Sequence, residues 1–197
     1  FGYGHAVSVI IVSEGATSWD VFPAAKDVIL YEQQGCLSPH IIYYEGKISV
    51  SLGLLEPCFE KCCFDLRVPP VTAHKAITVR QARDVALFSG WQVLGDESFQ
   101  TTMIINNKPT PYPEPVGHSV IYISPVQSPE NLRELLQPVW GIVTCAGVAG
   151  ELSSQWGSVL REAGVSRICK PGEMQTPPLD WANGNRDLLA ELLRLPQ

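Results

Sequence analysis

The chain has 197 residues, of which 45% are hydrophobic, so it is long enough to bury a sizeable core as one domain or as a large part of a bigger protein. Its 14 basic and 20 acidic residues give a net charge of -6, which argues against nucleic acid or an anionic membrane as the main partner. The longest early apolar run, residues 6–12, is far shorter than the roughly 20 residues of a spanning helix and follows no basic segment, so we expect neither a membrane span nor a secretory signal. Six cysteines without regular spacing are typical of a reducing compartment, and we expect a cytoplasmic protein.

Strand and helix patterns alternate from the first residues onward. A buried-strand pattern over 6–12 is followed by a helix pattern over 18–34, and Gly35 is a natural left-handed terminator for that helix. A second buried-strand pattern covers 40–44. This order, with a crossover of this length, favours a parallel strand pair with a right-handed connection.

The later patterns continue the alternation. They are a helix over 51–66 broken at Pro57, a loop over 67–74, a helix over 79–88, strands over 91–94 and 101–105, a proline-rich loop over 106–115, a strand over 120–126, a helix from Ser128-Pro129-Glu130 to Pro138 at the latest, a strand over 142–146, a helix ending at Gly164, a strand over 165–169 and a helix over 185–195. The alternation predicts an open, mainly parallel α/β sheet with helices on both faces.

A single cysteine lies where the first helix pattern ends and the second strand pattern begins. Pro39 bars further helix, so Cys36 lies on a short connector between two packed elements, where a reacting group is held rigidly and stays accessible. A thiolate is a good nucleophile and an acceptable leaving group, and the backbone N–H groups of a turn can stabilise an oxyanion. The negative end of a preceding helix does not favour a thiolate, so its activation must come from elsewhere. The alternative is a small core thiol.

The histidines offer bases for a rival class, the cysteine-histidine hydrolases. No acid or amide at a recognisable spacing accompanies any of them, and His118, in a loop, is the first to test. The four are His5, His40, His74 and His118.

The other cysteines have structural explanations. Cys58 and Cys62 share a helix face, with Cys63 beside them, but no second pair with ligand spacing follows, so we expect core packing and no metal site. Cys145 and Cys169 lie inside strand patterns, and we expect both to be structural.

Two blocks near opposite ends of the chain resemble one protein family. Tyr31-Glu-Gln-Gln-Gly-Cys36-Leu-Ser-Pro39 is similar to the nucleophile segment of the long-chain fatty acyl-CoA reductases, the bioluminescence-operon branch of the aldehyde dehydrogenase superfamily. Gly164-Val-Ser-Arg-Ile-Cys-Lys-Pro-Gly-Glu-Met174, followed by Pro177-Pro178 and Trp181, resembles the closing segment of that family. The blocks occur in the family's order, and the residues between them match only in pattern. The resemblance assigns no role to Arg167 within the second block.

The resemblance implies a catalytic domain over 1–197 that is the C-terminal half of an aldehyde dehydrogenase-like chain. Cys36 would accept the acyl group of a fatty acyl-CoA or an acyl-protein thioester, and NADPH would reduce it to the fatty aldehyde. Because the chain opens directly on a strand pattern and has no G-x-G-x-x-G segment, we expect the nucleotide-binding half to be missing. NADPH would then bind mainly to that missing domain, and this segment alone would be inactive in reduction.

Glu114 is the one cofactor contact that the resemblance suggests. Glu114-Pro-Val-Gly-His118 is similar to the superfamily's Glu-x-x-Gly-Pro segment, which holds the nicotinamide ribose. The alternative is a solvated loop acid among prolines. The superfamily's water-activating glutamate would fall at residues 1–4, which contain no acid, so the resemblance favours reduction over hydrolysis.

The resemblance also implies partners. We expect a homo-oligomer, with an acyl-transferring enzyme as a further partner. The alternatives are a non-catalytic assembly module of the same fold and a cysteine-dependent thioester hydrolase or acyltransferase.

Overall fold

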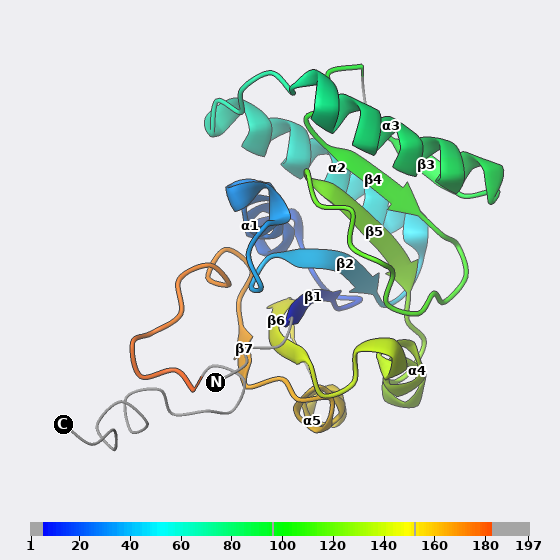
Figure 1. The fold of residues 1–197 in the computed structure, drawn as a ribbon. Coiled ribbons are helices and arrows are strands. Elements are labelled where there is room, and N and C mark those ends of the chain that lie inside the picture. The colour runs from blue at the N-terminus through cyan, green and yellow to red at the C-terminus, as the bar shows by residue number, and fades with distance from the viewer. Residues whose placement is uncertain (1–5, 96, 152, 183–197) are drawn as a thin grey trace.

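The structure, a computed structural model, describes residues 6–95, 97–151 and 153–182. A seven-stranded sheet in the order β3-β4-β5-β2-β1-β6-β7 forms its centre (Figure 1). All neighbouring strands are parallel except β3, which pairs antiparallel with β4 at one edge. The open, mainly parallel α/β sheet predicted from the sequence is confirmed.

The elements follow one another in regular alternation over most of the chain. The strands are β1 Val7–Val12, β2 Pro39–Tyr44, β3 Gln92–Leu94, β4 Thr102–Ile105, β5 Val120–Pro125, β6 Val143–Ala149 and β7 Arg167–Cys169. The helices are α1 Ser18–Ile29, α2 Ile48–Asp65, α3 Ala73–Phe88, α4 Pro129–Leu135 and α5 Ser154–Glu162, with short 3-10 turns η1 Leu30–Gln33 and η2 Gln137–Val139.

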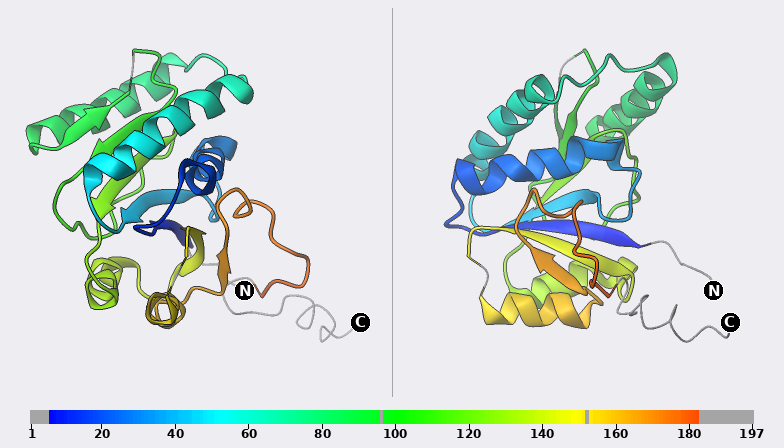
Figure 2. Two further views of the ribbon diagram at one scale, coloured as in Figure 1. Left: turned by 180° about the vertical axis from the view of Figure 1, so that it is seen from behind. Right: turned by 90° about the vertical axis from the view of Figure 1, so that its left-hand side faces the viewer.

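Helices cover both faces of the sheet (Figures 1 and 2). Because successive strand side chains alternate between faces, Ile10 and Ile42 join the core under α1 and α2, whereas Val9 and Ile41 join the core over α4 and α5. On the face of α4 and α5, α3 covers β4 and β5. The central strands β1 and β2 are therefore buried on both sides, which explains their nearly continuous apolar sequences.

The helix predicted over 18–34 ends earlier, at Ile29. Beyond it, Tyr31, Glu32 and Gln33 have φ values of 57°, 53° and 59°. A right-handed helix cannot continue through three left-handed residues, so Gly35 does not terminate it and the negative end of α1 does not adjoin Cys36.

The structure also differs from the predictions at the start or interior of two other helices. Pro57 lies inside α2 without ending it, on an exposed part of the helix where water can satisfy the carbonyl that proline leaves unpaired. The predicted loop over 67–74 ends at Thr72, whose hydroxyl accepts a hydrogen bond from Lys75 N and caps α3. The helix predicted over 185–195 lies outside the described residues. Among the described helices, none is long and apolar enough to cross a membrane.

Candidate active site

A cavity of about 1070 Å³ opens at the amino ends of the central strands, and we call it the amino-edge cavity. Its wall comes from segments that lead into four neighbouring strands, namely 6–7 into β1, 32–36 into β2, 112–118 into β5 and 138–142 into β6. Ligands of open α/β folds usually bind at the carboxyl ends of the strands. This site lies at the opposite edge, where the loops entering the sheet converge.

Cys36 lies on the wall of the amino-edge cavity with its side chain exposed. Its carbonyl accepts a hydrogen bond from Ser8 Oγ at 2.8 Å, and Gly35 O accepts one from Ser38 N at 3.0 Å. Gln33 Nε2 donates to Pro39 O at 2.8 Å across the same connector. The thiol is thus accessible on a turn that is held on both sides, and its catalytic role stays a prediction.

The loop before β5 packs directly on the cysteine connector. His118 N donates a hydrogen bond to Glu32 O at 3.0 Å. Gly117, His118 and Ser119 have φ values of 74°, 55° and 58°, and a Cβ on Gly117 would lie 3.8 Å from Glu32 O. Two left-handed runs therefore meet at Glu32, on the connector that carries Cys36, and non-glycine residues in this conformation concentrate at functional sites.

The structure brings several of the predicted site residues together. Glu114, His40 and His118 line the amino-edge cavity with Cys36, although the loop of Glu114 and His118 lies far along the chain from Cys36 and His40. Glu114 is exposed on the proline-rich loop. His74 is exposed on α3, away from this cavity, and His5 lies outside the described residues.

Burial and pairing set the charges around the cavity. Desolvation lowers the pKa of His40 to about 4, so this imidazole is neutral at pH 7. Desolvation raises the pKa of Tyr112 far above its ordinary value, so the phenol stays protonated. The Glu32 carboxylate forms an ion pair with Lys75 of α3.

Buried polar atoms without hydrogen-bond partners gather at this cavity. Among the described residues they are Asp27 Oδ1, Gln33 Oε1, His40 Nδ1, Tyr112 Oη and His118 Nδ1, and all but the first belong to residues of the cavity wall. Nearly all buried polar groups in proteins are hydrogen-bonded, so each exception calls for an explanation. Their gathering at one cavity indicates a place where a polar ligand completes the hydrogen bonding.

Asp27 supports the cysteine connector from behind, and the sequence interpretation missed it. Its side chain is fully buried in α1 and accepts a hydrogen bond from Gly172 N. Gln175 Nε2 then donates to Asp27 O at 3.3 Å and to Ser38 Oγ at 3.0 Å. Desolvation raises the pKa of Asp27 to about 6. The available signal was a carboxylate beside the apolar residues Val28 and Ile29 of the helix.

Arg167 has a clear structural role. Its guanidinium donates to Met174 O at 3.0 Å and to Thr176 O at 3.3 Å, and it thereby holds the segment that contacts Asp27 and Ser38. The two sequence blocks that carried the family resemblance are therefore parts of one contact, with the closing block bracing the connector of Cys36.

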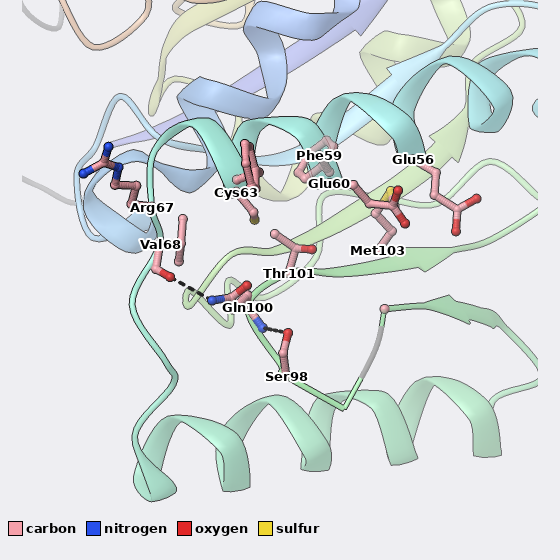
Figure 3. A pocket seen from close by; sticks show the side chains of 12 residues that line it. Glu56, Phe59, Glu60, Cys63, Arg67, Val68, Ser98, Gln100, Thr101 and Met103 are labelled. Atoms are coloured by element: carbon pink, nitrogen blue, oxygen red, sulfur yellow. Dashed lines mark hydrogen bonds between the residues drawn. The ribbon is translucent and has the colours of Figure 1, made fainter.

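The remaining cysteines lie elsewhere. Cys58 and Cys62 are buried between α1 and α2, and burial raises the pKa of Cys62 to about 11. Cys63 lines a second cavity of about 580 Å³, the α2 cavity, together with Glu56 and Glu60 (Figure 3). No cluster of three or more potential metal ligands occurs in the part of the chain that the structure describes. The sulfurs of Cys145 and Cys169, on the neighbouring strands β6 and β7, are 3.9 Å apart.

The fold is that of the aldehyde dehydrogenase superfamily. A putative methylmalonate-semialdehyde dehydrogenase from Sinorhizobium meliloti, complexed with NAD, matches with a TM-score of 0.62 and 12% identity over 92% of this chain and 42% of its own. Betaine aldehyde dehydrogenase from Staphylococcus aureus, in complex with NAD+, matches with a TM-score of 0.56 and 14% identity over 83% of this chain and 37% of its own. This chain thus spans less than half the length of these enzymes.

Within that superfamily, the sequence identifies one branch. The family model described as acyl-CoA reductase (LuxC) matches residues 1–182, and the chain belongs to this family. No curated protein matches the sequence. The family resemblance inferred from the two blocks is confirmed.

Proposed function

We propose that this chain carries the acyl-transfer site of an acyl-CoA reductase that converts a fatty acyl thioester into the fatty aldehyde through an acyl group on Cys36. The main support is the exposed Cys36 thiol on the wall of the amino-edge cavity, in a chain of the acyl-CoA reductase family. The substrate is fatty acyl-CoA or an acyl-protein thioester.

The first step is acyl transfer. The Cys36 sulfur attacks the thioester carbonyl, a new carbon–sulfur bond forms, and the bond to the CoA sulfur breaks as CoA leaves as a thiol. Among the described residues, the backbone N–H of Cys36 donates to no protein acceptor, and we propose it as a donor to the oxyanion that develops. The step consumes no oxidant or reductant.

The second step is reduction, for which we propose NADPH as hydride donor. When bound, a reduced nicotinamide supplies the hydride that releases the aldehyde, while the Cys36 sulfur regains a proton. Glu114 fits the nicotinamide ribose, because its exposed carboxylate lies on the same cavity wall as Cys36 and has no ion-pair partner among the described residues. The sequence has no G-x-G-x-x-G segment, so we assign no contact to the rest of the dinucleotide.

Intact mass spectrometry after incubation with a long-chain acyl-CoA tests the acyl transfer. We expect one added acyl group per chain, its loss on treatment with hydroxylamine, and no adduct with Cys36→Ser. Cys63→Ser is the matched control, since Cys63 is partly exposed and lines a different cavity. A wild-type chain that gains no acyl group, or an adduct that still forms on the Cys36→Ser variant, would contradict the proposal.

A second candidate is thioester hydrolysis or acyl transfer to another acceptor. It is favoured by the location of His118 on the same cavity wall as Cys36. The products separate the two functions: free fatty acid without NADPH indicates hydrolysis, whereas an adduct that persists until NADPH is supplied, in a protein with its nucleotide-binding part, indicates reduction. A homo-oligomer, an acyl-transferring partner enzyme and a purely structural role stay predictions of the family resemblance.

A further inference from the structure

Acyl transfer to Cys36 requires a proton acceptor and donor, and several titratable groups face the amino-edge cavity. Glu32 is paired with Lys75, and His40 is neutral because burial lowers its pKa to about 4. Tyr112 is buried and keeps its proton, since desolvation raises its pKa. The groups of this wall that remain are Glu114 and His118.

His118 is held against the cysteine connector by its own backbone. Its N–H donates to Glu32 O at 3.0 Å, and the left-handed φ of 55° fixes the direction in which its side chain leaves the loop. Glu114 is exposed and precedes it on the same loop, and among the described residues no hydrogen bond joins Glu114 to the connector. Of the two groups, His118 is the one whose backbone is hydrogen-bonded to the connector that carries Cys36.

The two ring nitrogens of His118 differ. Nδ1 is buried and has no hydrogen-bond partner, whereas the side chain as a whole is half-buried. We therefore take Nε2 as the nitrogen that exchanges protons with groups in the cavity. Imidazole is the side chain that both gains and loses a proton near neutral pH, which suits a group that must do both within one step.

We propose that His118 is a catalytic residue of the acyl-transfer step, with Nε2 as base and then acid. The proton of the Cys36 thiol passes to Nε2 as the sulfur bonds to the thioester carbonyl. When the bond from that carbon to the CoA sulfur breaks, the leaving sulfur takes the proton from Nε2, so CoA departs as a thiol and the imidazole is neutral again. This inference rests on the proposed function, since it concerns the same thioester.

Single-turnover acylation of the His118→Asn variant is the main test. Asparagine tolerates the left-handed backbone of this position and removes the imidazole. We expect the acylation rate to fall roughly 10²- to 10⁴-fold, the usual contribution of general acid–base catalysis.

Chemical rescue distinguishes proton transfer from a structural effect. Glycine also accepts the left-handed backbone, so His118→Gly leaves a gap that imidazole in solution can enter. We expect the acylation rate of this variant to rise with imidazole concentration. His74→Asn, an exposed histidine of α3 outside the cavity, should acylate at the wild-type rate and show no response to imidazole.

Alkylation of Cys36 with iodoacetamide tests the role of His118 independently of the proposed function, because this reaction uses no thioester. We expect His118→Asn to slow alkylation of Cys36 roughly tenfold at neutral pH by removing the base that assists thiolate formation. Slower alkylation in a chain that acyl-CoA never acylates would end the proposed function, and the acyl-transfer role of His118 with it, but would still show that His118 assists thiolate formation at Cys36. Folded His118→Asn that is acylated and alkylated at wild-type rates, or folded His118→Gly that imidazole fails to rescue, would overturn the role of His118.

Discussion

Among the described residues, the amino-edge cavity and the α2 cavity both contain a cysteine near acidic side chains, and they are built differently. The amino-edge cavity is formed by four segments that converge before the central strands. The α2 cavity lies between α2 and the segment leading into β4, at the edge of the sheet (Figure 3). Cys36 occupies a loop-built site, whereas Cys63 occupies one side of a continuous helix.

This difference teaches what a reactive site needs beyond a cysteine in a cavity. A helix presents side chains only at its own spacing, so the α2 side of that cavity brings Cys63 together with Glu60 and Glu56 of the same helix. Converging loops bring together residues far apart in the chain, and they place His118 and Glu114 on one wall with Cys36. The connector is also braced from behind by the closing segment. The comparison therefore predicts reactivity at Cys36 and its absence at Cys63.

Selective alkylation is the largest effect that the comparison predicts. At neutral pH we expect iodoacetamide to modify Cys36 at least tenfold faster than Cys63, because Cys36 is exposed and His118 shares its cavity. Cys62, whose pKa burial raises from 9.0 to about 11, should react about a hundredfold more slowly than an ordinary exposed thiol, since roughly that ratio separates their thiolate fractions. Peptide mapping at short times measures all these rates in one sample. Equal modification of Cys36 and Cys63 would remove the distinction between the two cavities.

The closing segment braces the cysteine connector through Gly172, which contacts Asp27, and Gln175, which contacts Ser38. We call these contacts the brace, and the ionisation of Asp27 makes the stability of the brace depend on pH. Burial raises the pKa of Asp27 in the folded chain to about 6, from an ordinary value of 3.8. Between these values the native state binds more protons than the unfolded state, so the free energy of unfolding falls as pH rises through this window. The shift corresponds to about 3 kcal/mol, present below pH 4 and lost above pH 6.

The free energies of unfolding of wild type and Asp27→Asn, measured with urea at pH 4.5 and pH 7, check this pH dependence. The variant keeps an acceptor oxygen for Gly172 N and cannot ionise. We expect the variant to gain stability relative to wild type as the pH rises. Asp84→Asn, an exposed acid on α3, serves as control and should show no such trend. A difference between wild type and Asp27→Asn that stays constant with pH would mean that Asp27 does not titrate in this window.

Glu114 tests whether the amino-edge cavity also holds the cofactor. In a protein that carries out the reduction, Glu114→Gln should weaken NADPH use about 10- to 100-fold, as expected for loss of a charged hydrogen bond, and leave acylation of Cys36 unchanged. Glu60→Gln, in the α2 cavity, should change neither half of the reaction. Acyl-adduct mass and aldehyde formation measure the two halves separately. Loss of acylation with Glu114→Gln would assign this residue to the acyl transfer and not to the cofactor.

The sheet could be predicted from the sequence because the residues of its own strands indicate their burial. The central strands β1 and β2 are apolar on both faces, and Ser128-Pro129 marks the start of α4 by a cap and a first-turn proline. Cys36 was placed correctly on an exposed connector because Pro39 bars helix at the start of β2, although α1 itself ends earlier, at Ile29. These features depend on neighbours in the sequence.

The assembly of the site was not readable, because it depends on contacts across the fold. No residue type near Tyr31 to Gln33 requires their left-handed backbone. The hydrogen bond that reaches this segment, from His118 N to Glu32 O, comes from a loop far along the chain. That loop reaches the connector because β5 lies beside β2, a strand order that no periodicity encodes. The same holds for Asp27 and Gly172, which are far apart in the chain and meet only in the folded protein.

Arg167 offers the smallest and most local test of the brace. Arg167→Met keeps a long apolar stem but loses the hydrogen bonds to Met174 O and Thr176 O, so we expect the free energy of unfolding to drop by about 1–2 kcal/mol. Arg80→Met, an exposed arginine of α3, should stay within about 0.5 kcal/mol of wild type. Hydrogen exchange adds the location of the effect.

If Arg167 holds the closing segment onto the connector, the N–H of Gly172, which donates to Asp27, should exchange faster in Arg167→Met while the amides of α3 keep their wild-type rates. Faster exchange at Gly172 together with slower alkylation of Cys36 would show that the brace supports reactivity. Faster exchange without any change at Cys36 would limit the brace to stability. The contrast between the two cavities would then rest on the converging loops alone.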